Sequence, residues 1–160
     1  MKKEIPGTCN ILLIAILLLS VLSFNCSLNS GTYEYVRFKT DTDIYLEYET
    51  KNYYEESGYF VMHAEDSAKT KVMDMILPEE EYLNIIYIPY DNISEIKFTD
   101  NTSSKTYSAS NLYGTAEVMF DSKPDSSLSE LSGSFSGKLV NIDDITDTLS
   151  ITEGYFIFVY

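Results

Sequence analysis

From residue 33 onwards, apolar and polar residues alternate in short runs, and a period of two is typical of half-buried β-strands. In the run 44–49, Ile44, Leu46 and Tyr48 share one face, while the residues between them share the other. Clusters of Gly, Pro, Asn, Asp and Ser separate the runs, as expected for turns. The pattern predicts strands at 33–39, 44–49, 59–63, 83–90, 93–99, 116–120, 131–139 and 148–160. We therefore expect an all-β fold: a single antiparallel β-sandwich or barrel-like domain.

Other segments are less regular. The stretch 66–82 has some helical character, but Pro78 interrupts it and its apolar residues suit a strand equally well, so we predict a further strand there. The stretch 50–58 is turn-like, and the polar segments 101–110 and 121–130 are expected to be exposed connections. The run 155–160 is apolar on both faces, which predicts a strand with neighbours on both sides.

The N-terminal segment has the pattern of an export signal. Lys2 and Lys3 precede an apolar run at 11–24, which is shorter than the roughly 20 residues that a membrane-spanning helix needs. No small-x-small cleavage pattern ends this run, and Cys26 follows it directly. We predict that 1–25 is a lipoprotein signal peptide, that 26–32 is a lipidated tether and that 33–160 is the β domain. Secretion without acylation, with Cys26 as an ordinary thiol at the edge of the fold, is the alternative.

Two parts of the chain resemble small envelope lipoproteins of the Bacteroidetes type. Ser23 and Asn25 ahead of Cys26 are similar to the relaxed processing signals of Bacteroidetes and spirochaete lipoproteins. The segments 131–139 and 149–156 resemble the closing hairpin of such proteins, in which a strand with the pattern S-G-x-F-x-G pairs with a later strand. The resemblance implies a small β-rich protein that is lipid-anchored in the cell envelope outside the cytoplasm, at the outer membrane. It implies no reaction.

Charge restricts the kinds of partner. The chain has a formal charge of −14, and removal of 1–25 would take away two lysines and one glutamate and leave −15. Such a chain repels phosphate backbones and anionic lipid surfaces, so we expect no nucleic acid partner and a membrane attachment that depends on the lipid on Cys26. The two cysteines, Cys9 and Cys26, both precede the β domain, which must therefore fold without a disulfide. No cofactor signature is present, and we expect no cofactor.

Tyrosines are the first candidates for a binding site. Tyr53 and Tyr54 lie in the turn-like stretch, and Tyr87 and Tyr90 flank Pro89. Exposed tyrosines offer a large contact area at low entropic cost, which suits an envelope protein or a glycan as the partner. Packing within the β domain is the alternative for all four.

Acidic residues and the single histidine are the other candidates. Asp143, Asp144 and Asp147 could contribute oxygen ligands to a calcium ion, although they lack the spacing of an EF-hand loop and also suit a solvated loop. His63 lies near two acidic residues and could act as the base of a hydrolase, but nothing marks a nucleophile, and a strand-end histidine is the simpler interpretation. We predict a non-catalytic binding or structural accessory protein. The alternatives are an inhibitor that presents an acidic loop to a basic enzyme, and a hydrolase that uses His63.

Overall fold

The computed structural model describes residues 34–41, 45–79, 84–121 and 130–159, with the backbone alone described at 45 and 49–56. The predicted signal peptide, the tether and Cys26 lie outside these ranges. Within them no helix is long and apolar enough to cross a bilayer.

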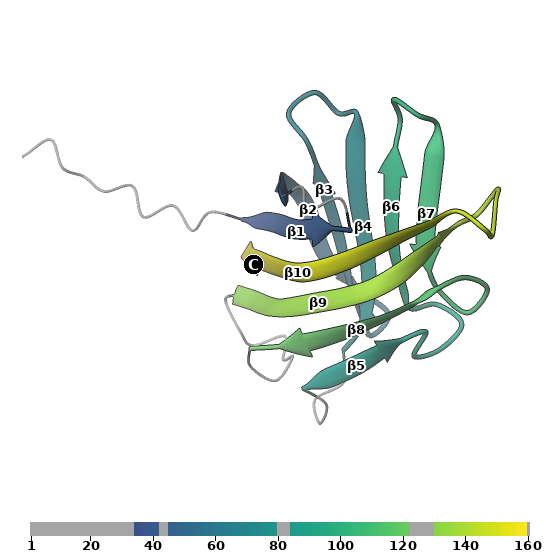
Figure 1. Ribbon diagram of the computed structural model, residues 1–160. Coiled ribbons are helices and arrows are strands. Elements are labelled where there is room, and N and C mark those ends of the chain that lie inside the picture. The colour runs from purple at the N-terminus through teal and green to yellow at the C-terminus, as the bar shows by residue number, and fades with distance from the viewer. Residues whose placement is uncertain (1–33, 42–44, 80–83, 122–129, 160) are drawn as a thin grey trace, which may run out of the picture. The chain divides into compact units, whose positions relative to one another are not determined.

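The described chain forms one antiparallel sheet that curls into a nearly closed barrel (Figure 1). The pairings connect β10, β1, β2, β3, β4, β6, β7 and β9 in that order, and β9 pairs with β10 again. On its other edge β9 pairs first with β8 and then, over two residue pairs, with β7. Strands β8 and β5 therefore extend the sheet beyond β9, and β5 is its last strand. The bounds are β1 (Tyr35–Thr40), β2 (Tyr45–Glu56), β3 (Tyr59–Glu65), β4 (Lys71–Pro78), β5 (Ile85–Ile88), β6 (Glu95–Asp100), β7 (Lys105–Ala109), β8 (Thr115–Phe120), β9 (Glu130–Asn141) and β10 (Thr148–Val159).

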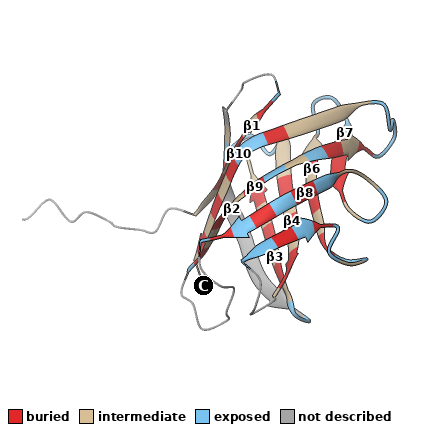
Figure 2. Ribbon diagram, turned by 60° about the horizontal axis from the view of Figure 1, so that its bottom comes forward, coloured by how far each residue is buried: buried red, intermediate tan, exposed pale blue. Residues whose placement is uncertain are grey.

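The alternating sequence pattern becomes an inner apolar face and an outer polar face. Buried residues alternate with more exposed ones along β1, β3, β5 and β8, and Figure 2 shows the same banding on the ribbon. The interior is rich in phenylalanine; the rings of Phe156 and Phe158 are 5.5 Å apart, and Phe120 meets Phe156 edge-on at 6.0 Å. The largest fully buried side chains are Phe38, Phe60, Phe156, Phe158, Met62, Met73, Met75, Leu77, Ile86, Ile88, Ile96 and Leu131.

The last two strands form a closing hairpin, as the sequence patterns at 131–139 and 149–156 predicted. β10 has neighbours on both sides, β9 and β1, which confirms the expectation for its apolar end. Its register shifts between Ile151 and Gly154, where a bulge places Glu153 at a φ of 52°. A Cβ atom on Gly154 would lie 2.4 Å from the Phe135 carbonyl oxygen, so only glycine allows the two strands to approach this closely.

Two segments differ from the sequence-based prediction. The predicted exposed connection at 101–110 contains β7, where Tyr107, Ser108 and Ala109 are buried. Ser108 is accommodated because its hydroxyl donates a hydrogen bond to the Glu95 carboxylate at 2.8 Å. The predicted turn-like stretch 50–58 is mostly strand, since β2 continues to Glu56. The prediction of a strand within 66–82 is confirmed by β4.

Candidate functional site

Exposed apolar side chains are concentrated in one part of the molecule. Eight large apolar side chains are exposed in the described ranges, and six of these lie on β5 or β8 or in the loops next to them. Scattered exposed apolar residues are normal on a protein surface, but a group of them on neighbouring elements is typical of an interaction site. The six are Ile85, Tyr87, Tyr90, Ile93, Leu112 and Met119.

The pairing of β5 with β8 brings four outward-facing side chains together. Ile85 lies opposite Met119, and Tyr87 lies opposite Glu117, two residues further along each strand. Tyr87 is 64% exposed, Met119 is 47% exposed and Ile85 is 41% exposed. We call these four residues the β5–β8 face. It consists of an apolar pair next to a pair formed by an aromatic ring and a carboxylate.

A shallow groove continues this face across β9. One depression, with a cavity volume of about 480 Å³, includes Tyr87, Pro89 and Glu117 in its lining. A second, of about 230 Å³, includes Met119 and Ser134. Both depressions are lined by Glu117 and Ser136, which lie opposite each other, so the depressions are neighbours along β8 and β9, and we call the two together the groove.

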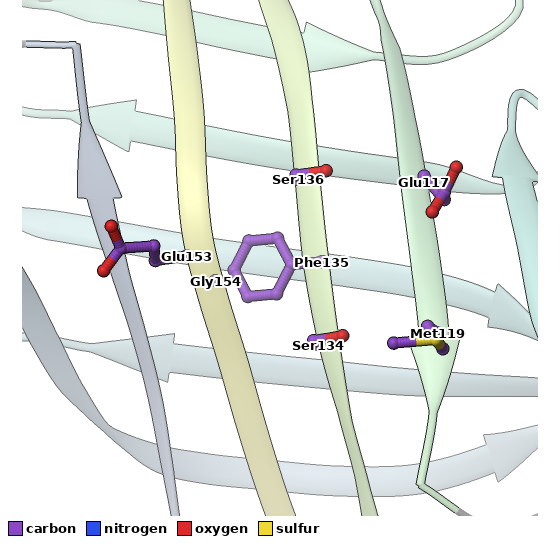
Figure 3. A pocket seen from close by; sticks show the side chains of 7 residues that line it. All are labelled: Glu117, Met119, Ser134, Phe135, Ser136, Glu153 and Gly154. Atoms are coloured by element: carbon purple, nitrogen blue, oxygen red, sulfur yellow. The ribbon is translucent and has the colours of Figure 1, made fainter.

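Small residues make this groove hollow. Figure 3 shows Glu117 and Met119 rising from β8 beside the short side chains of Ser134 and Ser136 on β9. Gly154 on β10 and Phe135, a core residue that is 4% exposed, line the end of the groove, and a Cβ atom on Gly154 would lie 2.7 Å from the Phe135 ring.

Glu153, the other acidic residue that lines the groove, extends from the far side of β10 (Figure 3). Its carboxylate lies 3.6 Å from the ammonium group of Lys39. Glu117, in contrast, forms no ion pair within the described part of the chain, so it is the carboxylate that remains available in the groove.

The loop after β5 is held by a network around Asp91. Its carboxylate accepts hydrogen bonds from the Tyr59 hydroxyl and from the amides of Ile93 (2.8 Å) and Ser94 (2.7 Å). Burial alone raises the pKa of Asp91, but these hydrogen bonds outweigh it and lower the pKa below its usual value. The loop, which follows a cis peptide bond at Pro89, therefore presents its exposed side chains from a fixed backbone.

Tyr87 and Tyr90, two of the four tyrosines that the sequence suggested, lie in this region. Tyr87 is part of the β5–β8 face, and Tyr90 is 43% exposed in the loop that follows. The backbones of Tyr53 and Tyr54 lie on β2, but their side chains are outside the described residues.

His63 has a carboxylate partner but lies away from the groove. It lies opposite Asp74 on β4, and its Nδ1 atom is 2.7 Å from an Asp74 oxygen. Lys97 on β6 lies 3.3 Å from the same carboxylate group. His63 thus belongs to a row of ionisable side chains across β3, β4 and β6, and no serine is hydrogen-bonded to its ring in the described part of the chain. The hydrolase alternative gains no support from this geometry.

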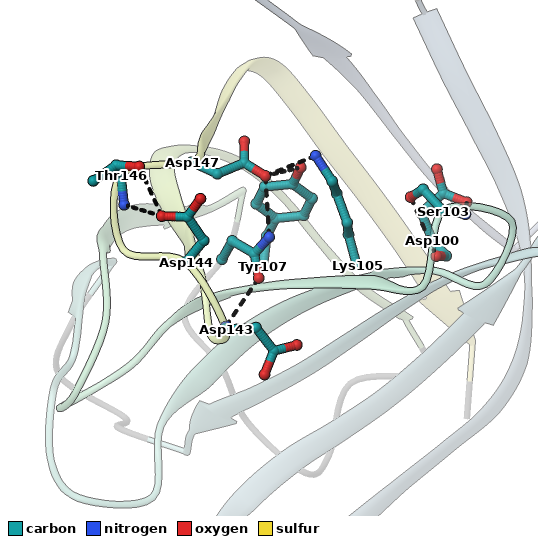
Figure 4. A network of polar contacts seen from close by, with 9 residues as sticks. Asp100, Ser103, Lys105, Tyr107, Asp143, Asp144, Thr146 and Asp147 are labelled. Carbon is teal, nitrogen blue, oxygen red and sulfur yellow. Dashed lines mark hydrogen bonds and ion pairs between the residues drawn. The ribbon is translucent and has the colours of Figure 1, made fainter.

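Two of the three aspartates proposed as calcium ligands, Asp144 and Asp147, accept hydrogen bonds through their carboxylates (Figure 4). Asp147 accepts hydrogen bonds from Lys105 (2.9 Å), Tyr107 (3.0 Å) and the amide group of Asn141 (3.0 Å), while Asp144 accepts two from Thr146. The hydrogen bonds to Asp147, first that from Asn141 and then that from Lys105, lower its pKa to about 2.

Asp143 contributes its backbone amide, which donates to the Asn141 side chain at 3.0 Å. Across the described ranges, no three His, Cys, Asp or Glu residues are grouped as metal ligands would be. The arrangement explains Asp144 and Asp147 as parts of a turn and gives the calcium hypothesis no support.

Glu117, Met119 and Ile85 were not recognised as site residues from the sequence. The sequence signal that could have identified the face is Met119, an apolar residue at a position of β8 where the alternation places exposed side chains. Comparison with protein-family models, with curated proteins and with solved structures gives no match, so the site is interpreted from its geometry.

Proposed function

We propose that this chain is a non-catalytic binding or structural accessory component of the cell envelope, lipid-anchored through Cys26, and that it binds its partner through the β5–β8 face. The observation that carries the proposal is the concentration of exposed apolar residues on β5, β8 and the adjoining loops. Exposed apolar groups next to a hollowed surface gain free energy when a partner removes them from water.

The sequence of the first 26 residues supports the anchor. A basic start, a short apolar run and a cysteine directly after it are features of a lipoprotein signal peptide. A triacylated cysteine carries more than one chain, which satisfies the requirement of two signals for stable attachment. The negative charge of the chain makes an electrostatic contribution from anionic lipids unfavourable, so the acyl chains would act alone.

Photo-cross-linking in the native envelope tests the binding role. A photoreactive phenylalanine derivative replaces Tyr87 in one variant and Ile145, which is exposed in the turn between β9 and β10, in the control. We expect a discrete adduct from position 87 and none from position 145. Equal labelling at both positions, or no adduct at position 87, would contradict the proposal.

A further inference from the structure

We infer that the β5–β8 face binds an extended segment of a partner protein in which a basic residue and an apolar residue are two positions apart. This inference rests on the proposed function and specifies the partner. The β5–β8 face consists of two cross-strand pairs, Ile85 with Met119 and Tyr87 with Glu117. They are two residues apart along each strand, a distance of about 7 Å. In an extended peptide, side chains at i and i+2 point to the same face with the same spacing.

The chemistry of one pair suits a cation. Glu117 is exposed and forms no ion pair with the residues that the structure describes, and it lies directly opposite the exposed ring of Tyr87. A tyrosine ring attracts an ammonium or guanidinium group through its π-face, and the neighbouring carboxylate adds a charge-assisted hydrogen bond. The formal charge of −14 on the chain favours approach of a basic segment and opposes an acidic one.

The chemistry of the other pair suits an apolar side chain. Ile85 and Met119 lie side by side on neighbouring strands and are both exposed. Beyond Met119 the surface falls to Ser134 on β9, which leaves room for the partner's backbone. The groove follows β8 from Thr115 to Met119, about 14 Å, which is the length of four extended residues.

A basic group of the chain itself lies close to this site. Lys138 on β9 is opposite Thr115, two residues from Glu117 on β8, and forms no ion pair within the described ranges. Its charge would repel a basic partner, while its ammonium group would compete for Glu117. Removing the charge of Lys138 should therefore strengthen binding of a basic segment. Binding of a purely apolar ligand or of a neutral glycan should not be strengthened by the same change.

Synthetic peptides test the inference on the full-length protein in detergent. The probe is a fluorescein-labelled octapeptide with arginine, serine and leucine at its centre and serine and glycine elsewhere. Its isomer has arginine and leucine adjacent, which places them on opposite faces of an extended chain. We expect the probe to bind about tenfold more tightly than the isomer, as measured by fluorescence anisotropy. Maltohexaose serves as a neutral glycan probe, and its effect on the tyrosine resonances is followed by NMR.

Four substitutions accompany the peptide measurement. Glu117→Gln and Tyr87→Ala should each weaken binding of the probe about fivefold or more, and Lys138→Gln should strengthen it. Glu47→Gln is the control, since Glu47 is likewise an exposed strand glutamate but lies on β2, away from the groove. All four side chains are exposed, so the substitutions leave the core unchanged. Circular dichroism checks that the variants fold.

Equal binding of probe and isomer, loss of binding in Glu47→Gln, or binding of maltohexaose through Tyr87 in place of the probe would overturn the inference. A discrete photo-adduct at position 87 together with any of these results would leave the proposed binding role standing and reject the basic segment as its ligand. Absence of the adduct would reject the proposed role itself.

Discussion

At the scale of single residues, Asp147 shows how one carboxylate holds a turn in place. Its Oδ2 atom accepts hydrogen bonds from the side chains of Lys105, Tyr107 and Asn141, which lie on β7 and at the end of β9. These donors stabilise the ionised form, so the pKa of about 2 in the folded protein lies below the value of about 3.9 expected for an unfolded chain. The resulting stabilisation is fully present above about pH 4 and is lost as the pH falls through 2.

Replacing Asp147 with asparagine should therefore lower the melting temperature at pH 7 and reduce the further loss between pH 4 and pH 2. The reason is that the variant has no charge at this position to lose. Thermal unfolding followed by circular dichroism at several pH values measures both effects. Asp143→Asn is the matched control, because the exposed Asp143 side chain makes none of these bonds. An acid profile of the Asp147→Asn variant parallel to that of the wild type would contradict this account.

The residues of the candidate site were only partly predictable. The exposure of Tyr87 follows from the alternation of β5, in which Ile86 and Ile88 point inwards. The significance of Glu117 depends on its position opposite Tyr87, thirty residues away in the chain. Such a pairing depends on which strands become neighbours, and local sequence patterns do not contain that information.

At the scale of the elements, the hairpin of β9 and β10 depends on the close approach at Gly154. Replacing Gly154 with alanine would bring Cβ within 2.4 Å of the Phe135 carbonyl oxygen and 2.7 Å of its ring. The strands would have to move apart, so the free energy of unfolding should fall by about 1–3 kcal/mol. Urea denaturation measures the change. Thr152→Ala, an exposed change in the same bulge, should stay within about 0.5 kcal/mol of the wild type, and an equal effect of the two would contradict the close packing.

Period-two patterns predicted most strands because one face of each is buried and the other is not. β7 was missed because its sequence is mainly polar, and its burial depends on the hydrogen bond between Ser108 and Glu95, which no local pattern indicates. The end of β2 was missed for another reason. The turn after it is short: Ser57 and Gly58 have φ values of 53° and 85°, as in the two-residue hairpins that connect strands tightly.

At the scale of the whole molecule, the anchor and the binding face belong to different segments of the chain. The anchor is predicted by the first 26 residues, whereas the face is formed by strands within the β domain. The intact mass of protein extracted from native membranes tests the anchor. We expect a chain that begins at an acylated Cys26, and we expect Cys26→Ala to be unprocessed or released from the membrane. An unacylated chain cut elsewhere would leave a secreted β domain.

We expect a partner in the envelope to cover the β5–β8 face. Because residues 33–160 contain no cysteine, a single introduced thiol can report on one position at a time. Ser136 lines both depressions, lies opposite Glu117 and is exposed, so Ser136→Cys places a thiol beside the face without removing a binding group. Ser136→Cys and, as a control, Glu47→Cys are treated with a maleimide reagent in intact envelopes and after purification. We expect the thiol at position 136 to be protected in the envelope and reactive in the purified protein, while the thiol at position 47 reacts in both. Equal reactivity of the thiol at position 136 in both states would show that nothing covers the face and would overturn the proposed binding role.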